Sequence, residues 1–432
     1  MNLINLRKLL FYNTGHKQTI FKNTFWLTMT EIFSKGIVFL VFIWLARYFG
    51  PEIYGKWNFA LSFVSLFIIL VDFGFSALTI REIARDKLKS SQYINNVLIM
   101  KLVLGLAVIG IIAFLTRFLE KDITTIRLVY FLSFYIVINS FTTFLQAIFR
   151  AYEKMQYETF CQLVQNISLL GLSAIFIFNG GSILAVSYIF AWTALVGFFL
   201  SIFFIQRYFS KILLKIDFKI CREILEKAWP FLFAGIFYMI YFEIGTVMLG
   251  VFSDMKEVGY YNAAYNLFLA AFIIPDIITM SFFPKLSYFY NKDKPELKKM
   301  FFNFRYIMIL VGFFSAIILF FSSDFIITNI YSSQFSNSIV LLKILSLIII
   351  FKFLSYTYSW FLTSADEQKQ VLKIQGLAAL LNIVFNYFLI IRYDSLGAVI
   401  ATVITEIFLL VFFYLSFRKK WGRIYKLNNL LT

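Results

Sequence analysis

Charged side chains inside long apolar runs are the residues of this sequence most able to do chemistry. A charge at the centre of a lipid bilayer costs about 2.5–3.5 kcal/mol on insertion scales, so each such residue needs a partner or a function. The acids in such runs are Glu31, Asp72, Glu243, Asp276 and Glu406, and the bases are Lys35, Lys101, Lys343 and Lys352, with Arg305 near the end of a run.

Two of the lysines lie far enough from the ends of their runs to act as anion-binding sites. Lys35 is about 14 Å into its run at 1.5 Å per residue, and Lys352 is near the middle of its own. An ammonium group in a water-filled cleft would bind an anion such as phosphate. Lys101, Lys343 and Arg305 lie nearer run ends, where the alternatives are structural ion pairs or side chains that extend to the membrane surface.

The carboxylates are candidates for ion coupling. A carboxylate removed from water holds its proton more readily and can then load and unload it near neutral pH. Glu243, near the middle of its run, is the first candidate for a proton- or cation-coupling residue, and Glu31 and Asp276 are further candidates. The alternative is a structural role, because Glu31 is spaced i, i+4 from Lys35 and could pair with it.

Amides and aromatic rings interleave in several of the apolar runs. Gln375, Asn382 and Asn386 fall at helical spacing on one face, and Tyr241 lies in a run rich in aromatic residues. Aromatic faces and amide donors suit sugar rings, which stack and form hydrogen bonds, so these four residues are the predicted glycan contacts. The alternative is that they are core or lipid-facing positions, since 21% of the chain is aromatic.

The composition shows which solvent surrounds these residues. Of the 432 residues, 61% are hydrophobic and only 15% are charged, against about 45–50% and 25% in soluble proteins. This excludes an ordinary soluble enzyme and a disordered chain. Two cysteines and the single His16 cannot build a disulfide framework, a histidine metal site or a catalytic triad. No nucleotide-binding or hydrolase motif is present, so we expect neither an enzyme nor a cofactor.

Twelve apolar runs are long enough to be membrane spans, which need about 20 residues each. We therefore predict an all-α membrane protein in which every outer loop is short. The approximate limits are 25–47, 57–80, 93–116, 128–148, 158–178, 183–206, 228–252, 259–283, 304–323, 338–362, 371–391 and 396–417.

Basic residues predict the orientation of these spans. Of the 40 Lys and Arg residues, 29 lie in the N-terminal arm, in the tail, or at the loops that follow the second, fourth, sixth, eighth and tenth predicted spans. Because Lys and Arg are retained on the cytoplasmic side, both termini are predicted to be cytoplasmic. The net charge of +17 is spread over separate loops, which favours lipid headgroups over nucleic acid as its counterions.

An internal repeat relates the two halves at an offset of 204 residues. Gly55–Ala60 matches Gly259–Ala264 as Gly-x-aromatic-Asn-x-Ala, and the same offset relates Asp72 to Asp276 and Lys101 to Arg305. Six spans return the chain to its starting side, so the halves should be related by a pseudo-two-fold axis along the membrane normal. We predict an N-lobe at 1–206, a basic cytoplasmic linker at 207–227 and a C-lobe at 228–432.

Several motifs of the chain resemble a known membrane family. It is similar to the polysaccharide-biosynthesis membrane proteins, the Wzx-type O-antigen flippases of the MOP (MATE-like) superfamily, over essentially its whole length. The residues that carry the resemblance are Phe49–Gly55, Val71–Ser76 and Arg81 in the first half, and Val258–Ala264, Pro275 and Phe283–Leu286 in the second.

The resemblance implies a function. Such proteins move a polyprenyl-pyrophosphate-linked oligosaccharide from the inner to the outer leaflet of the cytoplasmic membrane by ion-coupled alternating access. Cleft cations receive the pyrophosphate, and Lys35 is the match for the first-span cation. The family's span-eight Arg is missing here, and Lys352 or Arg305 would replace it. Membrane lipids and other polysaccharide-assembly proteins are the implied partners.

Two other functions fit parts of the sequence. A MATE-like antiporter of small cationic compounds would share the fold, but it would need a net acidic cleft, which the central lysines disfavour. A membrane enzyme such as a glycan polymerase would carry a large outer loop, and the predicted loops are too short for one.

Overall fold

The computed structural model describes residues 15–213 and 215–428, and every regular element in that part of the chain is helical. The basic residues Arg7 and Lys8 of the predicted cytoplasmic arm lie outside it. Within the described residues, nine helical stretches are long and apolar enough to cross a membrane, or ten with the bent pair Asn337–Leu347 and Ile349–Ser364 as one span. The chain is therefore a multi-pass membrane protein, as predicted, while the count of twelve spans stays a prediction.

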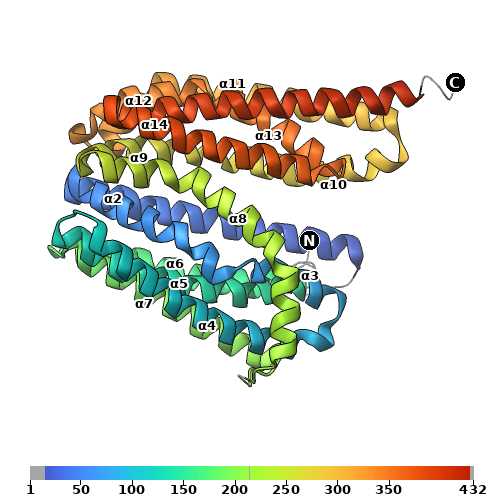
Figure 1. The fold of residues 1–432 in the computed structure, drawn as a ribbon, viewed down its shortest axis with the longest axis horizontal. Helices are drawn as coiled ribbons and strands as arrows, with labels where there is room; N and C mark the ends of the chain where they lie inside the picture. The colour runs from blue at the N-terminus through green and yellow to red at the C-terminus, as the bar shows by residue number, and fades with distance from the viewer. Residues whose placement is uncertain (1–14, 214, 429–432) are drawn as a thin grey trace, which may run out of the picture. The chain divides into compact units, whose positions relative to one another are not determined.

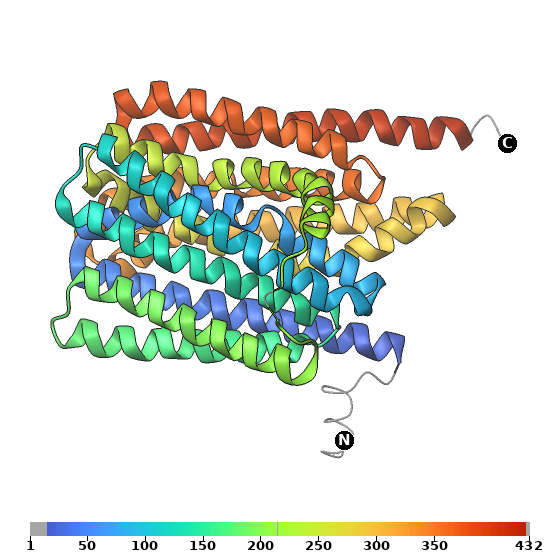
Figure 2. The same ribbon diagram turned by 60° about the horizontal axis from the view of Figure 1, so that its bottom comes forward.

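Two of the longest helices are interrupted. Helix α2 (His16–Asp72) breaks at Gly50, which has a φ of 74°, directly before Pro51. Glycine adopts this left-handed conformation without strain, and proline is well suited to begin the helix that follows. Helix α14 (Gln368–Asn428) breaks at Asp394, with a φ of 48°. Both ribbons double back on themselves, in blue for α2 and orange-red for α14 (Figures 1 and 2).

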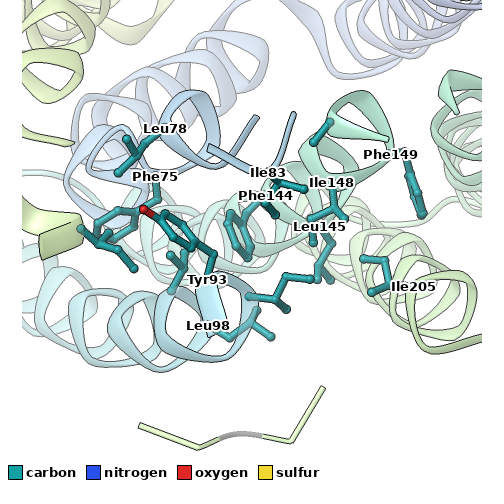
Figure 3. Close-up of a cluster of buried hydrophobic side chains, with 14 of the residues drawn as sticks. Phe75, Leu78, Ile83, Tyr93, Leu98, Phe144, Leu145, Ile148, Phe149 and Ile205 are labelled. Carbon is teal, nitrogen blue, oxygen red and sulfur yellow. The ribbon is translucent and has the colours of Figure 1, made fainter. Parts of the chain in front are cut away.

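The described residues within 1–48 and 60–239 form one compact unit, here called unit 1. Its core lies where α3 meets the helices around it, and Figure 3 shows Phe75 and Leu78 beside Phe144 and Tyr93. Besides parts of α2 and α8 (Phe218–Phe252), unit 1 contains α3 (Phe75–Arg85), α4 (Ser90–Leu115), α5 (Ile123–Ala151), α6 (Met155–Phe178) and α7 (Ile183–Tyr208), with short 3-10 turns at Lys87–Lys89 and Thr116–Phe118.

The described residues within 49–59 and 240–432 form the second compact unit, here called unit 2. The predicted linker 207–227 is partly helical, since α7 ends at Tyr208 and α8 already begins at Phe218. The predicted lobes 1–206 and 228–432 have other bounds than these units and stay a proposal. Unit 2 contains the end of α8, α9 (Met255–Ala270), α10 (Ile273–Lys292), α11 (Lys294–Ile326), a π-turn (Ile327–Tyr331), a 3-10 turn (Ser333–Phe335), α12 (Asn337–Leu347), α13 (Ile349–Ser364) and α14.

The repeat seen in the sequence extends to individual hydrogen bonds. The side-chain amide of Asn58 donates to the backbone oxygen of Tyr54 at 2.7 Å, and that of Asn262 donates to the backbone oxygen of Val258 at 2.9 Å. Both asparagines are buried. Each bond spans four residues in its helix, and the two bonds are related by the offset of 204 residues.

Repeat-related glycines also cross each other inside unit 2. A Cβ atom on Gly55 would lie 1.7 Å from the backbone oxygen of Met255, and one on Gly259 would lie 2.0 Å from that of Pro51. Pro51 and Met255, like Gly55 and Gly259, are 204 residues apart. Such an exchange of equivalent partners is what a local two-fold axis produces. The crossing holds the segment 49–59 against α9 at backbone contact, which only glycine permits.

Candidate functional site

A lysine, a tyrosine and a glutamate meet in the interior of unit 2. The ammonium of Lys352 on α13 donates to the carboxylate of Glu406 on α14 at 2.6 Å and to the hydroxyl of Tyr241 on α8 at 2.7 Å. The Tyr241 hydroxyl also donates to the same carboxylate oxygen. The Lys352 ammonium lies 4.4 Å from the centre of the Tyr241 ring, a cation–π distance.

Burial in this network is uneven. The Glu406 side chain is 0% exposed, whereas 12% of the Lys352 side chain is exposed. The second carboxylate oxygen of Glu406 is buried without a hydrogen-bond partner in the described structure. A buried acceptor of this kind normally finds a partner, because the desolvation of an unpaired oxygen costs free energy. The network therefore has one unused acceptor at its most buried point.

Two of the predicted glycan contacts are buried next to this network. The side-chain amide of Asn386 donates to the side-chain oxygen of Asn382 at 2.8 Å, and Asn382 donates to the hydroxyl of Thr405 at 3.0 Å. Thr405 directly precedes Glu406 on α14, so the two asparagines are linked to the residue next to the network. Gln375, predicted on the same face, is exposed. The amides thus divide into a buried pair and a surface residue.

Asp276 on α10 is bound to a tyrosine that lies one helical turn after Lys352 on α13. Its carboxylate accepts a hydrogen bond of 2.5 Å from the hydroxyl of Tyr356, which follows Lys352 by four residues. The Arg305 guanidinium lies 4.7 Å from the centre of the Phe302 ring on α11. These positions add a second carboxylate to the polar interior of unit 2.

Lys35 and Glu31 belong to unit 1 and form the expected i, i+4 pair. Their charged atoms are 2.8 Å apart, and the two side chains are 51% and 46% exposed. Lys35 is therefore an accessible cation rather than a buried one. Glu243 on α8 is partly buried and follows Tyr241 by two residues. The roles predicted for these residues in anion binding and ion coupling stay predictions.

Lys101 shows a different kind of lysine site, fully inside unit 1. Its ammonium donates to Asp72 at 2.9 Å and to the hydroxyl of Ser140 at 2.8 Å, and its side chain is 0% exposed. Asp72 also accepts from Ser76 at 2.6 Å. Lys101 therefore does not extend to the membrane surface, which was one of the two alternatives.

Lys352, Tyr241 and Glu406 are all recognisable in the sequence, but their combination in one network is not. Lys352 was predicted to bind pyrophosphate and Tyr241 to contact glycan, while Glu406 received no role. The available signal was an acid inside an apolar run, but its partner on α13 lies 54 residues away and only the packing identifies it. Among the described residues, no group of three or more His, Cys, Asp or Glu side chains could hold a metal ion.

Known proteins resemble this chain over most of its length. It is 21% identical to the capsular polysaccharide biosynthesis protein CapF of Staphylococcus aureus, covering 92% of this chain and 99% of CapF. It is 19% identical to the probable low-salt glycan biosynthesis flippase Agl15 of Haloferax volcanii, covering 88% of this chain and 79% of that protein.

Solved structures share the fold. The inward-facing structure of a multidrug resistance MATE family transporter of the MOP superfamily matches with a TM-score of 0.78 at 15% identity, covering 93% of this chain and 98% of that one. The lipid II flippase MurJ in its inward closed conformation matches with a TM-score of 0.74 at 17% identity, covering 93% and 90%. At these identities the likeness concerns the fold alone.

Sequence profiles of two families match the chain. Residues 230–388 match the MatE family, and residues 20–289 match the family described as polysaccharide biosynthesis protein. The second match covers more than half of the chain and includes the motif regions Phe49–Gly55 and Val258–Ala264. The resemblance stated from these motifs is confirmed, and the chain belongs to the polysaccharide biosynthesis protein family.

Proposed function

We propose that the protein is a flippase that moves a polyprenyl-pyrophosphate-linked oligosaccharide from the inner to the outer leaflet of the cytoplasmic membrane for cell-surface polysaccharide synthesis. The observation that carries the proposal is the family match over residues 20–289. Agl15, similar over 88% of this chain, is named as a probable flippase. Transport rather than catalysis also agrees with the sequence, which lacks nucleotide-binding and hydrolase motifs.

The chemistry of the substrate explains why such a protein would place cations in apolar helices. A diphosphate and a hydrophilic glycan cannot cross hydrocarbon without polar partners, whereas the polyprenyl tail can stay in lipid. Lys35, half exposed on α2, is the proposed first contact of the diphosphate. Lys352 and Arg305 are the proposed further contacts, and Tyr241, Asn382, Asn386 and Gln375 are the proposed glycan contacts.

The proposed topology has twelve spans in two lobes of six, with both termini in the cytoplasm. The breaks at Gly50 and Asp394 support this number, because each divides one continuous apolar helix into two. The positive-inside rule supports the orientation. Transport would proceed by alternating access, in which the binding residues face one side of the membrane at a time, with Glu243, Glu31 and Asp276 as proposed coupling groups.

Deletion and rescue of the gene in its host tests the function. We expect deletion to leave lipid-linked oligosaccharide on the inner leaflet, and the native chain to restore its export. Lys35→Ala should lower export at least tenfold at unchanged protein level, since a hydrogen bond to a charged group contributes about 1.5–3 kcal/mol. Lys299→Ala, which removes another exposed lysine paired with a glutamate, is the matched control and should export normally.

Two results would contradict this account at different levels. Normal export by the Lys35→Ala variant would remove Lys35 from the site without affecting the function. Absence of inner-leaflet accumulation after deletion would instead contradict the flippase itself.

A second candidate is a MATE-like antiporter that exports small cationic compounds. The match of residues 230–388 to the MatE family favours it. Such a site would need excess negative charge, and Glu406, the most buried acid near Lys352, is already neutralised by that lysine. A drug-resistance assay separates the candidates, because only an antiporter would raise tolerance to cationic compounds.

A further inference from the structure

Two lysine–carboxylate pairs in the described part of the chain have a fully buried member, and they differ in how the carboxylate is surrounded. In unit 1, Lys101 donates to Asp72 and Ser140, and Asp72 accepts in addition from Ser76. In unit 2, Glu406 accepts from Lys352 and Tyr241 through one carboxylate oxygen, and its other oxygen is buried without a partner. Both donors of Asp72 also meet a single carboxylate oxygen, but 23% of the Asp72 side chain is exposed, whereas the second oxygen of Glu406 is buried. Only the second pair therefore has a buried acceptor to spare.

An ion pair with an unsatisfied oxygen is an expensive way to hold helices together. A pair of charges removed from water gains stability only when further hydrogen bonds satisfy the remaining lone pairs. The Lys352–Glu406 pair does not meet this condition on the carboxylate side. The geometry instead suits an exchange of partners at Lys352. Lys352 is partly exposed and can bind an incoming anion, while Glu406 stays buried.

We propose that Glu406 is a proton-coupling residue that competes with the substrate for Lys352, an inference that rests on the proposed function. In the substrate-free state the Lys352 ammonium pairs with the Glu406 carboxylate. When a diphosphate oxygen binds to the ammonium, the carboxylate loses its counter-charge and takes up one proton from water. The carboxylic acid keeps the Tyr241 hydroxyl as its hydrogen-bond partner. When the diphosphate leaves, Glu406 releases the proton and pairs with Lys352 again.

The surroundings of Glu406 favour this exchange. Lys352 from α13 and Tyr241 from α8 contact its carboxylate directly. Other titratable groups on the surrounding helices are Glu243 of α8, Tyr261 of α9, and Asp276 of α10, which accepts from Tyr356 of α13. Helix α12 contributes Lys343, which pairs with Asp324 at 2.6 Å. Among the described residues, Lys352 is thus the cation that forms an ion pair with Glu406. Its withdrawal would leave a buried negative charge, which a proton neutralises.

The proposal predicts that binding of a diphosphate is linked to proton uptake. The test uses the purified full chain and UDP-N-acetylglucosamine, a diphosphate diester whose own charge does not change near pH 7. Calorimetric titration in two buffers of different ionisation enthalpy gives both the affinity and the number of protons exchanged. The native chain should take up close to one proton per bound probe, independently of sodium.

Variants assign the proton to Glu406. Glu406→Gln should bind the probe at least as tightly as the native chain, because the competitor for Lys352 has lost its charge, and should take up no proton. Lys352→Gln should weaken binding at least tenfold. Asp324→Asn is the matched control, since Asp324 forms an equally short pair with Lys343 but is exposed, and it should behave like the native chain.

Should the unpaired Lys352 prevent Glu406→Gln from folding, the double variant with Lys352→Gln carries no buried charge and should show no proton uptake. The inference is overturned by a native chain that does not bind the probe, by binding without proton uptake, by uptake that requires sodium, or by uptake that persists in either Glu406→Gln variant. None of these results affects the export assay of the deletion strain, so failure of this inference and failure of the proposed function are distinguishable.

Discussion

Three lysine side chains of this protein differ in their burial and in their partners. Lys101 is fully buried and paired with Asp72, Lys352 is mostly buried and shared between Glu406 and Tyr241, and Lys35 is half exposed. The cost of removing the charge from water rises from Lys35 through Lys352 to Lys101. We therefore expect substitutions at Lys101 to affect folding, and substitutions at Lys35 to affect transport.

Replacing Lys101 tests the structural end of the series. Lys101→Met should lower the free energy of unfolding by about 3–5 kcal/mol, because it leaves the Asp72 carboxylate without its cation. Unfolding of the purified protein in detergent, followed by circular dichroism, measures the change. The double variant Lys101→Met with Asp72→Asn should recover most of the loss. Equal instability of the single and double variants would mean that packing around Lys101, rather than its charge, is what matters.

At the scale of the helices, a helix break and a close helix crossing position the elements that carry these side chains. The break at Phe73 and Gly74, with φ of 51° and 79°, separates α2 from α3 just after Asp72, whose carboxylate pairs with Lys101 of α4. In unit 2, the crossing of Gly55 and Gly259 holds the segment 49–59 against α9. Both arrangements depend on glycine, for its backbone conformation at Gly74 and for its missing side chain at the crossing.

Adding one methyl group tests the crossing. Gly55→Ala and Gly259→Ala should each destabilise the protein by more than 1 kcal/mol, because the new Cβ would overlap a backbone oxygen that cannot move aside. Gly110→Ala and Gly171→Ala are matched helical controls with nothing within 4 Å of the new Cβ. They should be neutral or stabilising by up to about 1 kcal/mol. Thermal unfolding in detergent compares the four, and equal behaviour of both pairs would contradict close packing at the crossing.

Charge distribution governs how the whole molecule lies in the membrane. The basic residues are concentrated in alternate loops and at both ends of the chain, while the loop at Asn179–Ser182 between α6 and α7 carries no charge. Since lysine and arginine are retained in the cytoplasm, each loop is assigned to one side. The proposed topology of twelve spans counts the breaks at Gly50 and Asp394 as turns.

Reporter fusions test this topology. Alkaline phosphatase, which is active only outside the cytoplasmic membrane, should be active when inserted at 179–182 and inactive when inserted at 152–154 or joined to the C-terminus. A fluorescent protein that matures only in the cytoplasm should give the opposite pattern at all three places. Phosphatase activity at the C-terminus would require an odd number of spans or an external N-terminus.

The sequence alone determined the solvent, the helical class, the repeat register and the family of this protein. Each depends on composition, on the length of apolar runs or on short motifs such as Gly55–Ala60, which are readable along one chain. Only the tertiary structure decided which polar groups meet. Lys352 could have faced an open passage, but it lies against Glu406, and Gln375 lies outside the face that buries Asn382 and Asn386. Pairing depends on distances between helices far apart in sequence, and helical periodicity fixes only the face within one helix.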